Sequence, residues 1–313
     1  DGWAQETFVD PVKAATHADF RFQGEYAGEI RTDEGPVRVG VQVIARGEGR
    51  FDLVAYRGGL PGDGWDGKTR IRGKGRRDGE KVESEAEAGE GGSSTIEGGR
   101  MTIRAPDGEV VGTIPKVERK SPTLGKEPPR AAHILFDGSS TWRFKDGRKT
   151  EDGLLEQGAV THERFGDGTL HIEFRTPFRP GARGQDRGNS GVYLQGRYEV
   201  QVLDSFGLEP KHDDCGGIYE IAAPQVPMCF PPLSWQTYDI EFREARFDSA
   251  GQVVEPARMT VWHNGVLVHE NVPVERATRA ALIGEVKPEP GPLYLQDHGN
   301  PVRYRNIWFL PAR

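Results

Sequence analysis

Apolar and polar residues alternate along many short runs of this chain, and a period of two is typical of β-strands with one buried face. In the first part of the chain, strands are predicted over 37–44, 50–56, 101–104 and 109–114. Further along, the runs become longer and more aromatic, and strands are predicted over 169–174, 191–195, 198–203, 218–221, 237–243, 257–263, 293–296 and 303–309. Many short strands separated by turns such as Asn264-Gly265 indicate a β-sandwich or jelly roll.

A charged hairpin is predicted in the first part of the chain. Cations occupy every second position of one strand, at Lys68, Arg70, Arg72, Lys74 and Arg76. An Asp78-Gly79 turn follows, and glutamates then alternate in the same way. A two-residue loop at this turn would place Lys74 opposite Glu83, Arg72 opposite Glu85 and Arg70 opposite Glu87. The matched charges favour a solvated hairpin over a site for phosphate or an acidic polymer.

Composition supports the β assignment and divides the chain. The 42 glycines and 22 prolines disfavour helices, which both residue types interrupt. Residues 119–131 are charged and proline-rich with few apolar anchors, so a linker is predicted there. We therefore expect an all-β protein with a smaller antiparallel domain over 1–118 and a larger domain over 132–313.

Charge and hydropathy limit the classes of partner. The formal net charge of −7 disfavours nucleic acid as the main partner. No apolar run approaches the roughly 20 residues of a membrane span. The sequence leaves the oligomeric state open. The chain begins at Asp1 without a basic and apolar leader, which leads us to expect that a signal peptide has been removed.

Two cysteines, Cys215 and Cys229, flank a loop rich in glycine and proline. They are too few for a structural zinc site, and no CxxC motif is present. A disulfide that closes the loop is predicted over the alternative of two buried thiols. Together with the expected signal peptide, the disulfide would place the protein in the periplasm or outside the cell.

Three clusters place polar side chains on predicted strands, where a plain sandwich would carry apolar ones. In the first cluster, over 188–204, alternation puts Glu199 and Gln201 on one face and valines on the other. The second cluster covers 216–220. In the third, over 291–308, Tyr294, Gln296 and His298 share a face.

The ordered motifs FDG, GNSGVY, YEVQVLDSF, GGIYE, WHNGVLV and GPLYLQDHGNPVRYRNIWF resemble the 3-keto-disaccharide hydrolase family over about residues 134–309. The resemblance implies a concanavalin-like jelly roll of two antiparallel sheets that binds a sugar oxidised to a ketone at C3. The ketone acidifies the hydrogen on C2, so a base can remove it and the C1 substituent can leave by β-elimination. Water then adds to give the free 3-keto sugar.

This chemistry needs a base, an acid for the departing oxygen and a group that holds the enolate. His298 is the leading candidate for the base, Glu199 is a candidate acid or base, and Arg305 could polarise the ketone. The candidates for substrate binding are Gln201, Gln296, Tyr193, Tyr219, Glu220 and Asn189. Glu199, His298 and Asp204 are candidate ligands for a divalent cation, although the sequence contains no complete ligand set. No nicotinamide fingerprint is present.

Each of these residues also has a structural interpretation. His298 could simply hydrogen-bond within an Asp-His-Gly turn, Glu199 could belong to a buried ion pair, and Asn189 could cap a turn. Two other functions stay open, a non-catalytic carbohydrate-binding module and a glycoside hydrolase with two carboxylates. The strand Glu199-Val200-Gln201 carries an amide where such a hydrolase carries its second carboxylate, unless Glu220 supplies it.

Overall fold

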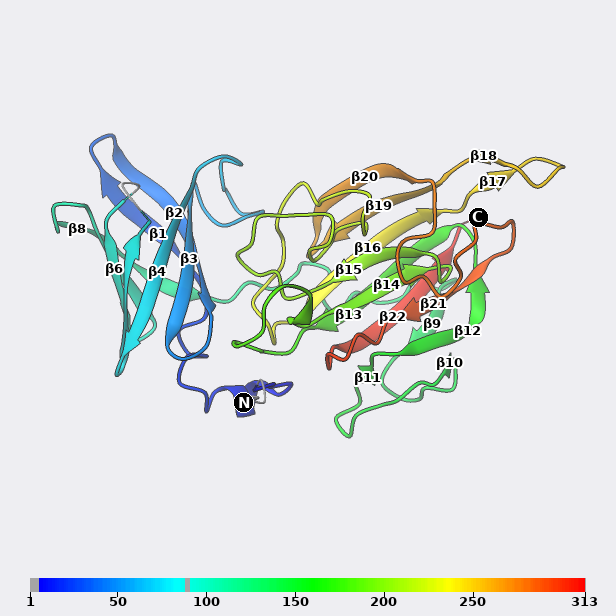
Figure 1. The fold of residues 1–313 in the computed structure, drawn as a ribbon, viewed down its shortest axis with the longest axis horizontal. Helices are drawn as coiled ribbons and strands as arrows, with labels where there is room; N and C mark the ends of the chain where they lie inside the picture. The colour runs from blue at the N-terminus through cyan, green and yellow to red at the C-terminus, as the bar shows by residue number, and fades with distance from the viewer. Residues whose placement is uncertain (1–5, 88–90, 313) are drawn as a thin grey trace. The chain divides into compact units, whose positions relative to one another are not determined.

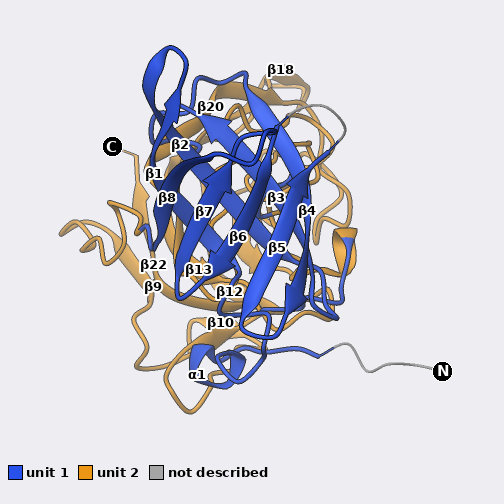
Figure 2. Ribbon diagram, turned by 90° about the vertical axis from the view of Figure 1, so that its left-hand side faces the viewer, with its two compact units in different colours: residues 1–119, 178–183, 206–208 blue, residues 120–177, 184–205, 209–313 orange. Residues whose placement is uncertain are grey.

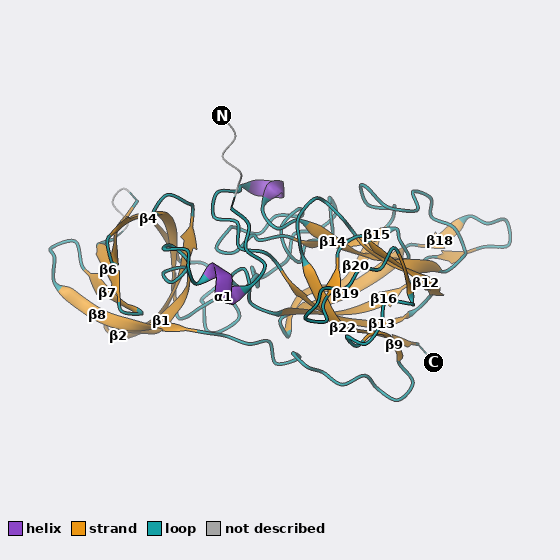
Figure 3. Ribbon diagram, turned by 90° about the horizontal axis from the view of Figure 1, so that it is seen from below, coloured by secondary structure: helices purple, strands orange, loops and turns teal. Residues whose placement is uncertain are grey.

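The computed structural model describes residues 6–87 and 91–312, nearly all of them in strands and loops (Figure 3). It forms two compact units. Unit 1 comprises residues 1–119, 178–183 and 206–208, and unit 2 comprises 120–177, 184–205 and 209–313 (Figure 2). The described part contains no helix with the length and apolar character needed to cross a bilayer.

Unit 1 is an antiparallel barrel whose eight strands follow one another in chain order (Figure 1). The short helix α1 (Pro11–Ala14) precedes it and is capped by the side chain of Asp10. The last strand pairs with the first, which leaves no free sheet edge. The strands are β1 (Gly24–Thr32), β2 (Gly35–Ala45), β3 (Arg50–Arg57), β4 (Arg70–Asp78), β5 (Lys81–Ala86), β6 (Ser93–Glu97), β7 (Arg100–Arg104) and β8 (Val110–Val117).

The predicted charged hairpin forms, with a register two residues away from the predicted one. β4 pairs with β5 so that Lys74 lies opposite Glu85 and Arg76 opposite Glu83. The loop is Gly79-Glu80, because the positive φ of 56° falls on Gly79, and glycine in the first loop position is typical of type II′ turns. The ammonium group of Lys74 lies 2.8 Å from Asp52 and 3.5 Å from Glu87, so Lys74 is paired with carboxylates other than the predicted Glu83.

Unit 2 is a sandwich of two antiparallel sheets, as the sequence predicted. The five-stranded sheet has the order β10 (Phe144–Lys145), β12 (Ala159–Phe165), β21 (Gly291–Leu295), β14 (Ser190–Leu194) and β15 (Tyr198–Val202). The seven-stranded sheet has the order β11 (Leu155–Glu156), β22 (Arg303–Pro311), β13 (Gly168–Arg175), β16 (Gln236–Arg243), β19 (Ala257–His263) and β20 (Val266–Val274), and β9 (His133–Phe136) pairs with β22. A ribbon of β17 (Arg246–Phe247) and β18 (Val253–Glu255) and a 3₁₀ turn over Gly184–Asp186 complete the unit.

The inner faces of the two sheets form the core of unit 2. Two tyrosines of the seven-stranded sheet connect the layers, since the Tyr238 hydroxyl donates to the carbonyl of Gln201 at 2.6 Å and the Tyr304 hydroxyl lies 2.6 Å from that of Ser190. Alternation then places the apolar side chains of the same strands between the sheets, where the following are fully buried: Leu170, Ile172, Val192, Val200, Val202, Ile240, Val261, Leu295 and Ile307.

Residues 218–221, predicted as a strand, form a turn instead. The amide of Ala222 donates to the carbonyl of Ile218, and the amide of Ile218 donates back to Ala222. Glu220 adopts a positive φ of 56°, which a strand does not allow. Only Ile218 keeps a bridge to Val200 of β15, so this cluster reaches the sheet as a turn at its edge.

The disulfide predicted between Cys215 and Cys229 is absent, and both residues are buried free thiols. The Cys215 sulfur lies 3.2 Å from the Tyr238 hydroxyl, and the Cys229 sulfur lies 3.5 Å from the carbonyl oxygen of Leu203. Both side chains belong to the core between the sheets, where cysteine behaves as a small apolar residue. Two free thiols give no support for an oxidising compartment, and periplasmic or extracellular location stays a prediction.

The segment predicted as a linker contacts the outer face of the seven-stranded sheet. The hydroxyls of Ser121 and Thr123 lie 2.7 and 2.9 Å from that of Thr237. Lys126 forms an ion pair with Asp239 at 2.8 Å. Polar matching to the sheet therefore holds a segment whose composition offers few apolar anchors.

Beneath this segment, His171 is fully buried between two carboxylates. Its Nδ1 lies 3.0 Å from Asp239 and its Nε2 lies 3.7 Å from Glu173, and its ring stacks on Trp308. Burial lowers the pKa of His171, but the hydrogen bonds and charges of the two carboxylates outweigh it and raise the pKa above the usual value. The protonated imidazolium therefore stabilises unit 2.

The stabilisation by His171 should depend on pH. Because the pKa is raised in the folded state, the contribution is complete below about pH 6.5 and is lost as the pH rises through the raised pKa. We expect His171→Gln to lower the free energy of unfolding by about 3 kcal/mol at pH 6 and by less at pH 9, measured by urea titration. The exposed His162→Gln is the matched control, and an equal effect of His171→Gln at both pH values would contradict the assignment.

Candidate active site

Strands β14 and β15 carry the polar row of the candidate site. Their register places Tyr193 opposite Glu199 and Gly191 opposite Gln201. Alternation turns Val192 and Val200 into the core, so these four residues lie on the face of the five-stranded sheet that points away from the other sheet. β21 continues the row, because Tyr294 pairs with Tyr193.

A cavity of about 260 Å³ opens on this face. It is smaller than the cavities that hold drug-sized ligands, roughly 300–1,000 Å³, and its size suits a single sugar ring. Seven of the residues predicted from the sequence meet there. The lining residues are Gln185, Asn189, Tyr193, Glu199, Gln201, Tyr219, Arg279, Ala280, Gln296 and His298.

Glu199 is a buried carboxyl group with a phenol beside it. Its side chain is almost inaccessible, and the Tyr193 hydroxyl lies 2.7 Å from its Oε2. Burial raises the pKa of Glu199 to about 8, the hydrogen bond from Tyr193 opposes the rise, and the charge of Glu220 adds to it. No ion pair of Glu199 is found in the described part of the chain, so at neutral pH the carboxyl group holds a proton that it can donate.

Gly191 leaves the space that this carboxyl group occupies. A Cβ atom at this position would lie 2.1 Å from Oε1 of Glu199 and 2.8 Å from the ring of Tyr193. The cross-strand position beside Gln201 therefore accepts only glycine while Glu199 and Tyr193 keep their contact. This steric constraint explains the glycine in the GNSGVY motif.

Next to Glu199 and Tyr193, the floor of the cavity is formed by amide side chains. Oε1 of Gln185 accepts hydrogen bonds from Asn189 at 2.9 Å and from Gln201 at 3.0 Å. Gln185 in turn donates to the carbonyl of Asp213. Oδ1 of Asn189 is buried without a hydrogen-bond partner in the described structure. Gln296 donates to the Tyr193 hydroxyl at 3.2 Å, so the amides orient the phenol as well.

His298 lies in the loop between β21 and β22 and is exposed. Its backbone carbonyl accepts a hydrogen bond from Asn300, which fixes the turn. Within the described residues, the imidazole itself makes no hydrogen bond and no ion pair. It therefore lines the cavity with its nitrogens available to a ligand, in agreement with its predicted place.

A loop after β20 supplies the remaining wall of the cavity. Thr278 anchors it to β15, because the Thr278 hydroxyl donates to the carbonyl of Arg197 and accepts from the amide of Glu199. Arg279 and Ala280 then line the cavity. Neither residue was predicted from the sequence, because this loop contains no recognisable motif. Gln185 was not predicted either, although its position just before the GNSGVY motif could have indicated it.

Glu220 does not line the cavity, although it was predicted to bind substrate. Its carboxylate lies 3.5 Å from Arg279 and 3.6 Å from Arg276 at the rim. Tyr219, its neighbour, does reach the cavity. Glu220 therefore acts on the site through the charge that raises the pKa of Glu199.

The structure places Arg305 away from this cavity, and its predicted role at the enolate is wrong for this site. It lies on the outer face of the seven-stranded sheet, where its Nε donates to Glu173 at 2.7 Å and its guanidinium stacks on Trp235 at 3.9 Å. Asn306, at a positive φ of 43° beside an irregularity in the register of β22, also donates to Glu173. Arg305 was assigned from its residue type and its expected face of a strand, and neither of these tells which sheet the strand joins.

The three candidate metal ligands do not come together. Asp204 is buried in an ion pair with Arg187 at 2.7 Å. Glu199 is held by the phenol of Tyr193, and His298 lies on the loop. No group of three or more acidic, histidine or cysteine side chains suited to a metal is found among the described residues. The donor set therefore does not fit a divalent cation.

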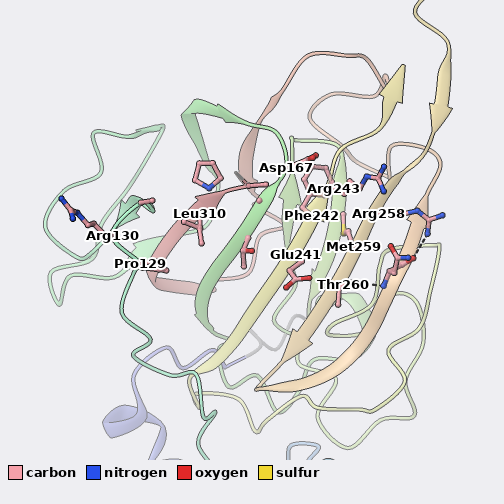
Figure 4. A pocket seen from close by; sticks show the side chains of 16 residues that line it. Pro129, Arg130, Asp167, Glu241, Phe242, Arg243, Arg258, Met259, Thr260 and Leu310 are labelled. Carbon is pink, nitrogen blue, oxygen red and sulfur yellow. Dashed lines mark hydrogen bonds between the residues drawn. The ribbon is translucent and has the colours of Figure 1, made fainter. Parts of the chain in front are cut away.

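A larger cavity, of about 860 Å³, lies on the outer face of the seven-stranded sheet (Figure 4). Two of its arginines already have partners. Arg258 donates to the carbonyl of Asn271, and Arg243 pairs with Glu255. Asp167 in the lining pairs with Arg246, and burial would raise the pKa of this carboxylate, but the hydrogen bonds from Arg246 and from the amide of Glu244 outweigh burial and lower it. We therefore place the chemistry in the smaller cavity.

Comparison with known proteins defines the class. The family model described as the 3-keto-alpha-glucoside-1,2-lyase-like domain matches residues 131–310, and the chain belongs to this family. A candidate glycosyl hydrolase of known structure from Parabacteroides distasonis ATCC 8503 is 31% identical and has a TM-score of 0.52. The match covers 59% of this chain and 85% of that one.

A second candidate glycosyl hydrolase from the same organism is 18% identical, with a TM-score of 0.41, and covers 58% of this chain and 94% of that one. No curated protein matches the chain. The family, together with the neighbour that is 31% identical, indicates a carbohydrate-active enzyme.

The environment of Glu199 can be tested by titration. We expect its carboxyl carbon to titrate near pH 8 in ¹³C NMR spectra, with Glu199→Gln used to assign the signal. Tyr193→Phe removes the hydrogen bond that stabilises the carboxylate, so the pKa should rise further. Tyr294→Phe, which keeps that hydrogen bond, is the control. Titration of Glu199 near pH 4–5 would contradict its burial.

Proposed function

We propose that unit 2 cleaves 3-keto-glycosides by eliminating the C1 substituent, followed by hydration to the free 3-keto sugar. The observation that supports it most is that one small cavity contains both a carboxyl group protonated at neutral pH and an imidazole that has no hydrogen-bond or ion-pair partner among the described residues. Membership of the family adds the substrate class.

The raised pKa of Glu199 assigns the acid and the base. A carboxyl group that keeps its proton at pH 7 cannot accept another from C2, so Glu199 is the acid that protonates the departing C1 oxygen. His298 is then the base that removes the hydrogen from C2. The electron pair of that bond forms the enolate of the C3 ketone. When the C3 carbonyl re-forms, the electron pair of the C2–C3 double bond moves to form a C1–C2 double bond, and the C1–O bond breaks as the departing oxygen takes the proton of Glu199. In the hydration step, the oxygen of water then adds to C1 and a proton returns to C2.

Arg279 takes the role that the sequence gave to Arg305. It is the cationic side chain among the lining residues, and a guanidinium can stabilise the charge that develops on the ketone oxygen. Its ion pair with Glu220 is long, 3.5 Å, and exposed, so a substrate oxygen can compete for it. The amides of Gln201 and Gln185 and the side chain of Asn189 would bind the sugar hydroxyls.

The two alternative functions fit the cavity less well. A hydrolase with two carboxylates needs both groups on either side of the glycosidic bond. Among the described lining residues, Glu199 is the single carboxylate, because Glu220 is held at the rim by two arginines. A binding module needs amides and aromatic rings, but it gains nothing from a buried carboxyl group with a raised pKa.

The substrate should distinguish the three functions. We expect release of the phenol from an aryl 3-keto-glucoside and none from the parent aryl glucoside, followed by absorbance. Glu199→Gln and His298→Ala should each lower kcat/KM at least tenfold, because each removes one proton-transfer group. His162→Ala, an exposed histidine outside the cavity, should leave it unchanged. Release from the parent glucoside would instead indicate a hydrolase, and release from neither a binding module.

The pH dependence of kcat/KM should report the protonation of Glu199, the proposed acid. Because Glu199 must be protonated, kcat/KM on the keto sugar should fall above about pH 8. Tyr193→Phe should move this fall to higher pH, in parallel with the titration of the carboxyl group. A fall that starts near pH 5, or one that Tyr193→Phe leaves in place, would contradict the assignment of Glu199 as the acid.

A further inference from the structure

The barrel of unit 1 has an interior that its own side chains do not fill. Alternation points every second residue inward. Toward one end, large side chains fill the interior, and they are at most 1% exposed: Phe51, Val82, Ile96, Met101 and Ile114. Toward the other end, the inward positions of neighbouring strands are small, since Gly73 of β4 pairs with Ala86 of β5 and Ser84 of β5 pairs with Ser94 of β6.

A cavity of about 300 Å³ results. Its wall is apolar, and several of its aliphatic side chains are half-exposed although they point into the barrel: Ile30, Val37, Ala55, Ile71, Ala86 and Ile103. Half-exposure of inward-facing residues indicates that the cavity opens to solvent. Protein interiors are normally packed with few voids, and an eight-stranded barrel either fills with side chains or holds one small ligand.

The polar groups of the cavity define the chemistry of the ligand. The hydroxyls of Ser84 and Ser94 lie 2.6 Å apart and satisfy each other, so they leave no polar group that demands a partner. At the mouth, Arg57 pairs with Glu34 at 3.1 Å. Arg72 and Glu85 also belong to the lining, but alternation along β4 and β5 turns their side chains to the outer face of the barrel. Among the described residues, no free charge therefore points into the apolar part, where an unpaired ion would be costly to bury.

We propose that this barrel binds a small, uncharged, apolar molecule. An engineered apolar cavity of about 150 Å³ takes up benzene, so a cavity of this size would hold a fused or linked pair of rings. The site lies wholly within unit 1 and does not depend on the sugar chemistry proposed for unit 2.

Binding can be measured on the full chain with 1-naphthylamine, a neutral molecule with two fused rings whose fluorescence shifts to the blue in apolar surroundings. We expect saturable binding by the wild type. Ala55→Leu and Ala86→Leu each add three carbons to a residue that lines the cavity, and each should weaken binding at least tenfold. Thr102→Leu adds similar bulk on the outer face of β7 and should leave binding unchanged.

Circular dichroism and thermal unfolding establish whether each variant is folded. The two substitutions that fill the cavity lie on different strands, so if one variant misfolds, the other still tests the proposal. 1-Naphthalenesulfonate should bind at least tenfold more weakly than the neutral probe, because the cavity would have to bury its charge. Absence of binding by the wild type, equal binding by all variants, or a preference for the sulfonate would each overturn the proposal.

Discussion

The candidate site depends on the burial of one carboxyl group without a cation. Glu199 lies within the five-stranded sheet, where Gly191 makes room for it and Tyr193 provides its hydrogen bond. Burial favours the neutral form of such a group by more than one hydrogen bond to the charged form can offset. The cavity therefore contains a protonated carboxyl group at neutral pH, beside the amides and the imidazole that line it.

The two outer faces of the sandwich show how surroundings decide between structure and chemistry. On the seven-stranded sheet, burial would raise the pKa of Glu173, but hydrogen bonds from His171, Asn306, Gly125 and Arg305 outweigh it and lower the pKa to about 2. That carboxylate is permanently charged and fully engaged, and it helps hold the segment that starts unit 2. Glu199 has one phenol in place of these donors. Glu173 and Glu199 are therefore equally buried, but the pKa of Glu173 is lowered and that of Glu199 is raised.

Much of the fold and of the site could be predicted from alternation and motifs. The motifs brought Glu199, Gln201, Tyr193, Gln296 and His298 to one cavity, because alternation assigns strand residues to faces. Arg305 was misplaced, because a strand pattern gives the face of a residue and leaves its sheet undetermined. The disulfide failed for a related reason, since cysteines beside a loop can equally pack in a core, as both do here.

The sequence by itself determined the local properties of this protein: strands with period two, turns at glycine and asparagine, a hairpin with charges of opposite sign on its two strands, and the family. Tertiary structure alone decided what depends on long-range contact. It closed the first strands into a barrel with an open interior, shifted the charged hairpin by two residues, and brought Arg279 to the cavity in place of Arg305. Above all it set the pKa of Glu199, because burial is a property of the whole fold and is not encoded in any single stretch of the chain.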